Sequence, residues 1–292
     1  MDSQTSSAQS ERFKLAAVVV TFNRLHQLKT TINRLLSEDI DHLYVVDNGS
    51  TDQSRDWLAS LTEPRLHILL AEKNLGGAGG FEVGLKAAVA EQDPDWIVVM
   101  DDDARPYPGA MTDFRALDLA NRHAVAGAVY YPNGQICEMN RPSRNPFWHP
   151  RVFLKTLFGG GRLGFHIPDS DYQGGGLDLD ASSFVGFFVS RAAITQVGYP
   201  DGRLFLYGDD VIYTLGLRKS GLTLRFAPGI RFEHDCTTFT GTERVYSPIW
   251  KVYYNYRNGL IMYRLAAGIL CPSSYKMEHQ SGLSFGGSGS FA

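Results

Sequence analysis

The chain has 292 residues and a nearly balanced charge, with 28 Lys and Arg against 31 Asp and Glu and a formal net charge of −3. This length suits one large domain, or one domain with an appendage. The balance gives no sign of the basic surface that nucleic acid or strong attraction to anionic lipid requires, so we expect no nucleic-acid partner.

Cysteine usage and the termini indicate the compartment. Cys137, Cys236 and Cys271 lack C-x-x-C spacing, which predicts neither a disulfide framework nor a thiolate metal site and fits a reducing compartment. The N-terminal MDSQTSSAQSER is polar, and no apolar run reaches bilayer-spanning length. We therefore expect a cytoplasmic protein that does not cross a membrane, with a disordered leader at 1–12 and a flexible tail at 271–292.

The first third of the chain alternates between strand and helix patterns. The apolar run LAAVVVTFNR predicts a buried strand, and Leu28, Ile32, Leu35 and Leu36 recur at helical spacing in HQLKTTINRLLSE. The segments HLYVVDNGSTD, SRDWLASL, LHILLAE, NLGGAGGFEVGLKAAVAE and WIVVMDDDA continue the alternation. The pattern predicts a Rossmann-like α/β fold with a mixed, mainly parallel sheet flanked by helices.

Regularity fades between about residues 130 and 180, where aromatics, Pro and Gly predict long loops and irregular strands that hold substrate. A strand and helix follow in SSFVGFFVSRAAITQVG, and YSPIWKVYYNYRNGLIMYRLAAG predicts an aromatic, basic, amphipathic helix. We place a catalytic domain at 13–240, with a nucleotide-binding half at about 13–110 and an acceptor half at about 111–240. A helical segment follows at 241–270.

An acidic triplet, Asp101, Asp102 and Asp103, directly follows the strand WIVVM. Open α/β sheets bind ligands beyond the carboxyl ends of their strands. Adjacent carboxylates repel unless a hard cation lies between them, and Mg²⁺ favours a few carboxylates together with diphosphate oxygens. The triplet predicts a metal and diphosphate site. A solvated acidic turn or a helix N-cap is the alternative.

The glycine-rich stretch at 74–81, NLGGAGGF, is a second candidate site. Near Asn74, the backbone of Gly76 and Gly77 could approach a phosphate at a helix N-terminus. A tight turn that allows close helix packing is the alternative. A dinucleotide-binding loop would carry G-x-G-x-x-G directly after the first strand, so an NAD-dependent oxidoreductase is disfavoured.

Asp209 and Asp210 follow RLFLYG at the start of a predicted helix. Capping that helix is one interpretation; the other is a general base that removes a proton from an acceptor hydroxyl. His234 ends a further strand in RFEHDC and could give a neutral imidazole to a metal, although a single histidine is often structural.

The motifs VVVTFNR, LYVVDNGSTD, NLGGAGGF, VVMDDDA, FLYGDD and FEHD occur in this order. Together they resemble the family 2 glycosyltransferases with the GT-A fold, over roughly residues 15–264. With YYNYRN, they are most similar to the bacterial rhamnosyltransferase and galactofuranosyltransferase branch. The resemblance implies an inverting transferase that uses Mg²⁺ or Mn²⁺ and a nucleoside-diphosphate sugar on UDP or dTDP. Rhamnose or galactofuranose is favoured, a hexopyranose stays open, and the acceptor would be a glycan or lipid-linked glycan in cell-surface polysaccharide synthesis.

The resemblance also implies residue roles. The nucleobase-binding segment falls on Thr21, Phe22 and Arg24, and an aspartate that contacts the base falls on Asp47. The D-x-D motif falls on Asp101 and Asp103, with Asp103 as a direct metal ligand and His234 as a later one. The catalytic base falls on Asp210, while Asp209 binds the acceptor or orients the base. The whole donor-binding set is Thr21, Phe22, Arg24, Asp47, Asn74, Gly76, Gly77, Asp101 and Asp102.

The aromatic and glycine-rich middle is where we expect the acceptor sugar. Trp148, Tyr172 and Gly175 are the candidates, because aromatic faces stack on sugar rings; packing under a long loop is the alternative.

The C-terminal helix carries aromatic and basic residues that suit a bilayer surface. They are Tyr253, Tyr254, Tyr256, Lys251, Arg257 and Arg264. Peripheral contact with the inner face of the cell membrane would present a lipid-linked acceptor. Docking of this helix against the catalytic domain is the alternative, and a non-catalytic sugar-binding homologue with the same fold is the rival function, although the retained acidic motifs and His234 argue against lost catalysis.

Overall fold

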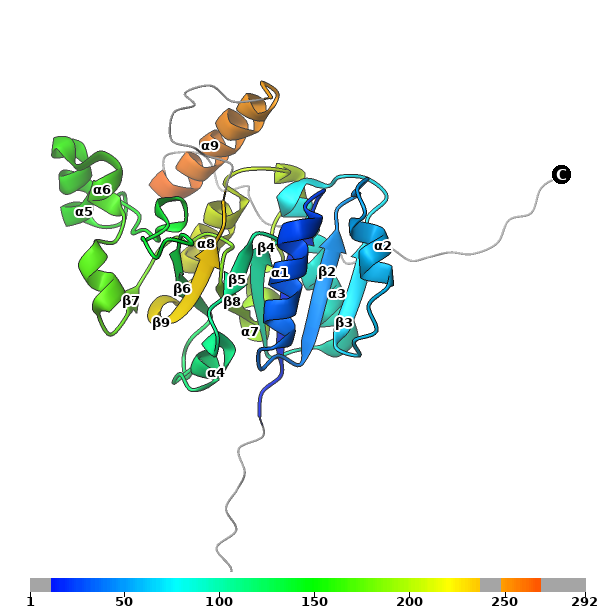
Figure 1. The fold of residues 1–292 in the computed structure, drawn as a ribbon. Helices are drawn as coiled ribbons and strands as arrows, with labels where there is room; N and C mark the ends of the chain where they lie inside the picture. The colour runs from blue at the N-terminus through cyan, green and yellow to red at the C-terminus, as the bar shows by residue number, and fades with distance from the viewer. Residues whose placement is uncertain (1–11, 237–247, 269–292) are drawn as a thin grey trace, which may run out of the picture.

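The structure, a computed structural model, describes residues 12–236 and 248–268. In this part of the chain one mixed sheet runs in the order β3-β2-β1-β4-β8-β6-β9-β5, and β7 pairs with β9 (Figure 1). The strands are β1 (Leu15–Thr21), β2 (His42–Asp47), β3 (Leu66–Leu70), β4 (Trp96–Asp101), β5 (Ala104–Pro106), β6 (Ala124–Tyr130), β7 (Leu177–Asp178), β8 (Phe187–Ser190) and β9 (Leu224–His234).

Helices cover both faces of the sheet and extend beyond one end of it. They are α1 (Leu25–Leu36), α2 (Ser54–Ala59), α3 (Gly76–Gln92), α4 (Ala110–Arg115), α5 (Pro150–Lys155), α6 (Gly161–Phe165), α7 (Arg191–Val197), α8 (Asp209–Lys219) and α9 (Lys251–Ala267). The 3₁₀-helical and π-helical turns are η1 (Glu138–Asn140), η2 (Thr156–Gly160), η3 (Asp169–Gln173) and η4 (Gly202–Leu204).

The predicted parallel arrangement holds for the first four strands. Every residue of β1 is buried, and β1 pairs in parallel with both β2 and β4. Because side chains alternate along a strand, Val20 packs with Phe81 of α3 on one face, while Val19 packs with Leu28 of α1 on the other. Beyond β4 the pairing becomes mixed, since β8 is antiparallel to both β4 and β6.

Helix α3 begins at Gly76, so most of the glycine-rich stretch lies inside the helix and not ahead of it. A Cβ on Gly80 would lie 2.5 Å from Cγ1 of Val20, and one on Gly84 would lie 2.4 Å from Cγ1 of Val18. These glycines let α3 approach β1 closely, which is the packing interpretation of the motif.

The middle of the chain departs from the prediction of loops and irregular strands. Residues 150–165 form a hairpin of α5, η2 and α6, which projects from the body of the molecule (Figure 1). The sequence signal was weak because α5 and η2 have no buried residue and thus no apolar face pointing to a core.

The predicted C-terminal helix is present as α9. The rest of the predicted segment 241–270, the tail at 271–292 and the leader up to residue 11 lie outside the described residues. Among the described helices, none combines the length and apolar character needed to cross a bilayer.

Candidate functional site

The predicted metal ligands lie together at the carboxyl ends of β4 and β9. Strand β5 follows the acidic triplet and pairs with β9 so that Ala104 lies opposite His234. This register places Asp101, Asp103 and His234 with their ligand atoms within 4.8 Å of one another. His234 Nε2 is 3.1 Å from Asp103 Oδ1. Two carboxylates and an imidazole are a donor set that suits Mn²⁺ or Mg²⁺, with positions left for phosphate oxygens and water.

The imidazole of His234 is oriented by Asn140, a residue that no sequence motif pointed to. Asn140 Oδ1 accepts a hydrogen bond from His234 Nδ1 at 2.6 Å, and the Asn140 amide donates to Ser183 Oγ at 3.0 Å. The second bond fixes the amide so that its oxygen faces the ring. Nδ1 then carries a proton toward Asn140, and Nε2 is the nitrogen that faces Asp103. Against the opposing effect of burial, the hydrogen bond to Asp103 raises the pKa of His234, so a metal bound at Nε2 would replace the proton that this nitrogen shares with Asp103.

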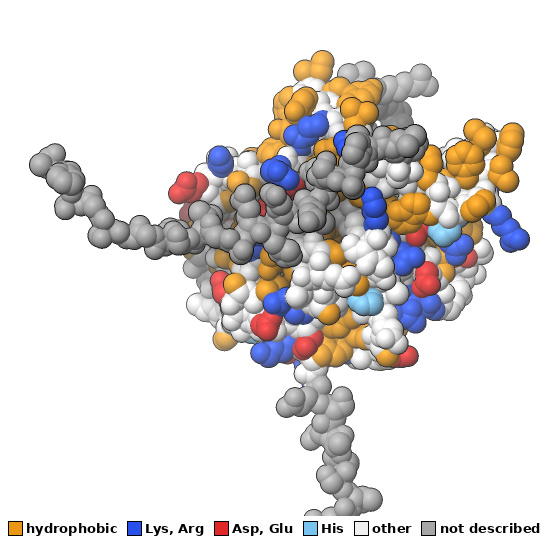
Figure 2. All heavy atoms as spheres, turned by 180° about the vertical axis from the view of Figure 1, so that it is seen from behind, with side chains coloured by type: hydrophobic (Ala, Val, Ile, Leu, Met, Phe, Trp, Pro, Cys, Tyr) orange, Lys and Arg blue, Asp and Glu red, His pale blue; other side chains and the backbone are white. Residues whose placement is uncertain are grey.

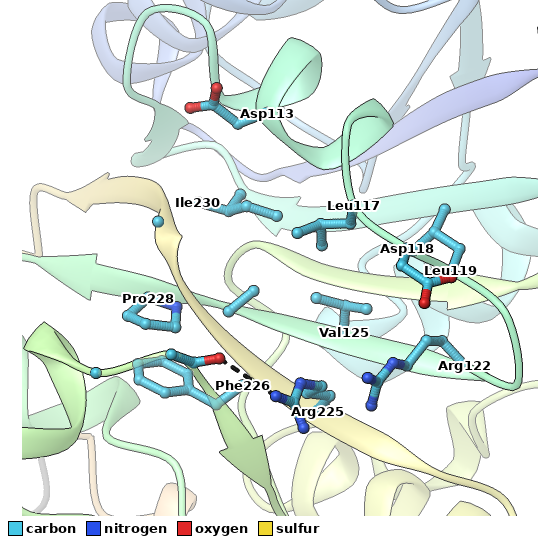
Figure 3. A pocket seen from close by; sticks show the side chains of 14 residues that line it. Asp113, Leu117, Asp118, Leu119, Arg122, Val125, Arg225, Phe226, Pro228 and Ile230 are labelled. Atoms are coloured by element: carbon cyan, nitrogen blue, oxygen red, sulfur yellow. Dashed lines mark hydrogen bonds between the residues drawn. The ribbon is translucent and has the colours of Figure 1, made fainter.

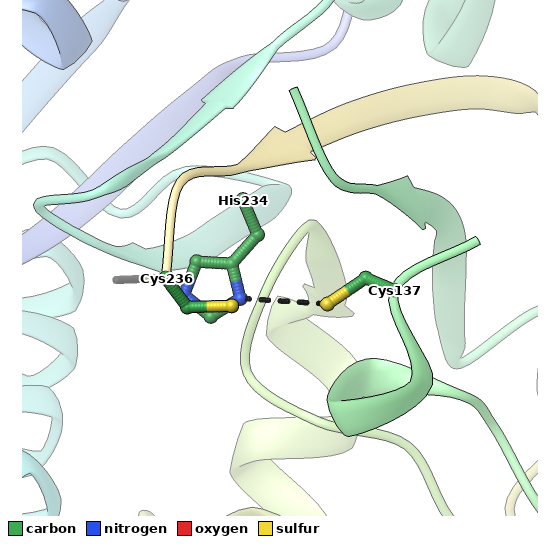
Figure 4. Close-up of side chains that lie close together, drawn as sticks. All are labelled: Cys137, His234 and Cys236. Carbon is green, nitrogen blue, oxygen red and sulfur yellow. Dashed lines mark hydrogen bonds between the residues drawn. The ribbon is translucent and has the colours of Figure 1, made fainter. Parts of the chain in front are cut away.

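Two cysteines flank the same histidine. Cys137 and Cys236 converge on the ring of His234 from separate segments, with Cys137 Sγ 4.0 Å from Nδ1 (Figure 4). The absence of C-x-x-C spacing gave no hint of this convergence. Cys137 Sγ donates to Asn140 Oδ1 at 3.0 Å, so its thiol belongs to the network that orients the imidazole.

Burial and charge perturb the carboxyl groups of the triplet. Burial raises the pKa of Asp101 to about 7, helped by the negative charge of Asp103, and raises the pKa of Asp102 to about 6. Burial acts on Asp103 as well, but the hydrogen bond and charge of His234 together with Arg24 hold its pKa below the usual value. A divalent cation would relieve the repulsion within this group.

The predicted base-binding segment surrounds the triplet. Thr21 and Asp102 are both buried, and Thr21 Oγ1 donates to the Asp102 carboxylate at 2.6 Å. This bond holds Asp102 in place beside the other two carboxylates of the triplet. Arg24 forms ion pairs with Asp103 and Asp102. Phe22 exposes 40% of its surface and offers a face for stacking.

Asp47 occupies a different environment from the one expected of a ligand contact. It is fully buried, and its Oδ1 accepts hydrogen bonds from the Ser50 backbone at 2.9 Å and from Arg55 Nε at 2.8 Å. Its Oδ2 has no partner in the described part of the chain. In this conformation Asp47 organises the loop after β2, and contact with a nucleobase would require that loop to move.

The start of α3 is held by two asparagines. Asn74 Oδ1 accepts from the Gly76 backbone at 2.7 Å, and Asn48, which sequence reasoning missed, donates to the Gly76 carbonyl at 2.7 Å. Gly76 has a φ of +72°, and a Cβ there would lie 2.0 Å from the carbonyl oxygen of Phe205. A Cβ on Gly77 would meet no atom within 4 Å, so of the two glycines predicted to bind the donor, Gly77 is the one beside open space.

The second acidic pair faces the same site. Asp210 Oδ1 accepts from the Val211 backbone at 2.7 Å, and the Phe184 N–H also donates to the Asp210 carboxylate. Burial raises the pKa of Asp210 to about 6. Burial and the charge of Asp210 raise the pKa of Asp209 well above its usual value, and the charge of Asp101 adds to this effect. Asp101 and Asp209 therefore interact electrostatically, although one lies at the end of β4 and the other at the start of α8.

Helix α9 holds the loop that leads into this pair. Asn258 is buried, and its amide donates to the carbonyls of Leu204, Leu206 and Tyr207 at 3.0, 2.8 and 2.7 Å. Arg257 Nη2 donates to the Leu204 carbonyl at 2.7 Å. The helix thus docks on the domain that carries the acidic motifs, which is the alternative to membrane contact that the sequence left open for it. Asn258 is the last residue of YYNYRN, a motif that carried no assigned role.

The three predicted acceptor residues lie in different environments. Trp148 packs against Leu215 of α8 and Ala266 of α9, while Tyr172 is buried with its ring edge-to-face against Phe226 at 4.9 Å. The packing interpretation accounts for Tyr172, whereas acceptor binding by Trp148 stays a prediction.

Gly175 lines a separate pocket at the start of β9. Its neighbours there include Arg225 and Phe226, and Arg225 Nη2 donates to the Gly175 carbonyl at 3.2 Å (Figure 3). Positions 225 and 234 are separated by about 30 Å along an extended strand. Gly175 is therefore distant from His234, and nothing in the geometry joins it to the metal ligands.

Comparison with known proteins identifies the family. The glycosyl transferase family 2 model matches residues 16–174. The chain is 32% identical over 226 residues to the galactofuranosyltransferase GlfT1 of Mycolicibacterium smegmatis, covering 77% of this chain and 72% of that protein. It is 28% identical over 254 residues to the N-acetylglucosaminyl-diphospho-decaprenol L-rhamnosyltransferase of Mycobacterium tuberculosis, covering 78% of each.

Solved structures share the fold. TarS of S. aureus in complex with UDP superimposes with a TM-score of 0.58 and 16% identity, covering 87% of this chain and 64% of that chain. GalNAc-T7 with UDP, GalNAc and Mn²⁺ superimposes with a TM-score of 0.60 and 11% identity, covering 87% and 48%. This chain spans less than two thirds of either. The GT-A fold and the branch implied by the motifs are confirmed, and the chain belongs to glycosyl transferase family 2.

Proposed function

We propose that this glycosyltransferase is metal-dependent and inverts the configuration at the anomeric carbon of a nucleoside-diphosphate sugar. The observation that carries the proposal is the convergence of Asp101, Asp103 and His234. Asp209, the neighbour of Asp210, lies close enough for the charge of Asp101 to raise its pKa. A single buried carboxylate pair without metal ligands would not distinguish transfer from simple sugar binding.

Donor binding is assigned to the residues around the triplet. Phe22 would stack on the nucleobase, and the open backbone at Gly77 would approach the diphosphate. A divalent cation held by Asp101, Asp103 and His234 would neutralise the diphosphate and stabilise the departing nucleoside diphosphate. Arg24 ion-pairs with Asp103 and Asp102 and would add a positive charge beside the diphosphate.

Asp210 is the proposed base. Inversion by a single displacement needs one carboxylate to take the proton from the acceptor hydroxyl as its oxygen attacks the anomeric carbon from the side opposite the leaving group. The backbone N–H groups of Val211 and Phe184 hold the Asp210 carboxylate in place, and its raised pKa makes it a stronger base than an exposed aspartate. Asp209 would bind the acceptor or orient the base.

The substrate class that we propose is taken from the names of the similar proteins. Names of the similar proteins specify galactofuranosyl and rhamnosyl transfer, so we propose a donor that carries galactofuranose on UDP or rhamnose on dTDP. The acceptor would be a lipid-linked glycan in cell-wall polysaccharide synthesis. It would be met at the inner face of the cell membrane, with α9 in peripheral contact with the lipid.

Thermal stabilisation tests the donor class. Selective binding raises the melting temperature, so we expect UDP or dTDP to raise it in the presence of Mn²⁺ and much less in EDTA. GDP and NAD serve as controls. Stabilisation by NAD alone would support the oxidoreductase alternative, and stabilisation without turnover of any donor would support a non-catalytic sugar-binding homologue.

A further inference from the structure

The hairpin at residues 150–165 exposes large apolar side chains at its tip. Leu157, Phe158 and Leu163 are 61%, 80% and 72% exposed, and Phe153 and Leu154 are exposed as well. The three elements of the hairpin, α5, η2 and α6, contact mainly one another, and Gly164 is the buried residue among them. Scattered single apolar residues on a surface need no explanation, but a projecting cluster of five does.

The hairpin is also one-sided in charge. Residues 139–168 contain no Asp or Glu, and residues 150–165 carry Arg151, Lys155 and Arg162. The ion pairs nearby lie at the base of the hairpin, where Arg141 pairs with Glu138 and Asp169. The balanced charge of the whole chain, from which we expected no strong attraction to anionic lipid, conceals this local excess of cations.

Helix α9 repeats the pattern close to the same end of the sheet. It contains Lys251, Arg257 and Arg264 and no acidic residue, and it exposes Tyr256 and Leu260. Figure 1 shows the hairpin and α9 extending beyond the sheet at the same end of the molecule, and the space-filling view shows hydrophobic side chains gathered at that end (Figure 2).

We propose that the hairpin at residues 150–165 inserts its apolar tip into the interface of an anionic lipid bilayer. Exposed Phe and Leu side chains beside Lys and Arg are the combination that binds such a surface, because the apolar groups enter the acyl boundary while the cations meet acidic headgroups. A second copy of the chain is a poorer occupant, since symmetric pairing would bring the cations of two hairpins together. The inference extends the membrane contact proposed for α9 and does not rest on sugar transfer.

Co-sedimentation with vesicles, without donor or metal, tests the proposal. The wild-type chain should bind vesicles that contain phosphatidylglycerol and bind pure phosphatidylcholine at least about tenfold more weakly. The double variant Leu157→Ser with Phe158→Ser should lose more than about tenfold of its affinity for the anionic vesicles, because two large side chains no longer enter the lipid. Lys155→Glu should weaken binding by about fivefold or more.

Matched variants separate the hairpin from the rest of the surface. Leu70→Ser removes a side chain of similar exposure, 57%, on β3 at the other edge of the sheet, and it should bind as the wild type does. Leu260→Ser reports the contribution of α9 with the hairpin intact. Melting curves confirm that the exposed substitutions leave the fold unchanged. The proposal is overturned if anionic vesicles do not bind the wild type, if the double variant binds as tightly as Leu70→Ser, or if the double variant instead converts a dimer into a monomer.

Discussion

The side-chain amide of Asn258 donates to the carbonyl oxygen of Tyr207 at 2.7 Å, two positions before Asp209. Phe205 and Tyr207 have positive φ angles of 65° and 69°, a conformation that is costly for residues with a side chain. The loop that presents the acidic pair is thus strained, and the asparagine on α9 supplies hydrogen bonds that hold it.

Replacing Asn258 by Ala should therefore affect catalysis more than donor binding. Three carbonyls lose a shared donor, which should cost about 1 to 3 kcal/mol of stability. We expect kcat to fall about tenfold or more as Asp210 loses its position, while the donor KM changes less than about threefold. Asn255→Ala, three positions earlier on α9, is the matched control. Equal kcat in both variants would show that the loop does not depend on Asn258.

Removing the acceptor of His234 Nδ1 should weaken metal binding. Asn140→Ala leaves the imidazole free to rotate and to change tautomer, and loss of such a partner typically lowers metal affinity by about 10- to 100-fold. Asn140→Asp keeps an acceptor oxygen and should retain most of the affinity. Titration with Mn²⁺, followed by the spectroscopic signal of the free ion, measures both variants. If Asn140→Ala binds Mn²⁺ as tightly as the wild type, then either His234 is not a metal ligand or Asn140 is not needed to orient it.

The buried carboxyl groups predict a pH-dependent stability. The pKa values of Asp101 and Asp209 are raised in the folded state, so each group favours folding when protonated and costs stability as the pH rises through its folded pKa. In EDTA, the melting temperature of Asp209→Asn relative to wild type should therefore increase between about pH 5 and about pH 8. Adding Mn²⁺ should raise the melting temperature of the wild type more at the higher pH than at the lower pH, because the cation binds the ionised carboxylates. A difference between variant and wild type that is independent of pH would contradict this account.

The ionisation of Asp210 should appear in the pH dependence of kcat. Asp210 accepts a proton only as the carboxylate, so kcat should fall as the pH drops below its pKa of about 6 and level off above it. Saturating Mn²⁺ keeps Asp101 ionised and separates the two titrations. A kcat that stays constant from about pH 5 to about pH 8 would exclude a base with this pKa.

The sequence was sufficient for the elements whose signal is local. The buried strands β1, β2 and β4 are continuous apolar runs, and Asp101 to Asp103 and Asp209 stand directly at the ends of such runs or at helix starts. His234 could be placed because β9 is a long strand that ends at it. In these cases residue type and position within one element carry the information.

What could not be predicted depends on contacts between distant segments. Asn140 and Asn258 are single polar residues in an irregular segment and on an amphipathic helix, and their roles appear only when the fold brings them to His234 and to the loop at 204–207. The glycines near Gly80 were ambiguous because packing against β1 and approach to a phosphate require the same missing side chain. In the sequence, Tyr172 is an aromatic residue in a predicted loop; only the fold shows that its ring lies in the core.

The most direct test of the central claim is the rate of sugar transfer by wild type and Asp210→Asn, with UDP-galactofuranose and dTDP-rhamnose as donors and nucleotide binding measured on the same preparations. We predict Mn²⁺-dependent release of one nucleoside diphosphate by the wild type. In Asp210→Asn we predict a loss in kcat of about 10²- to 10⁴-fold with an affinity for that nucleotide within about threefold of wild type. Transfer at the wild-type rate by Asp210→Asn, or by the wild type in EDTA, would contradict the account.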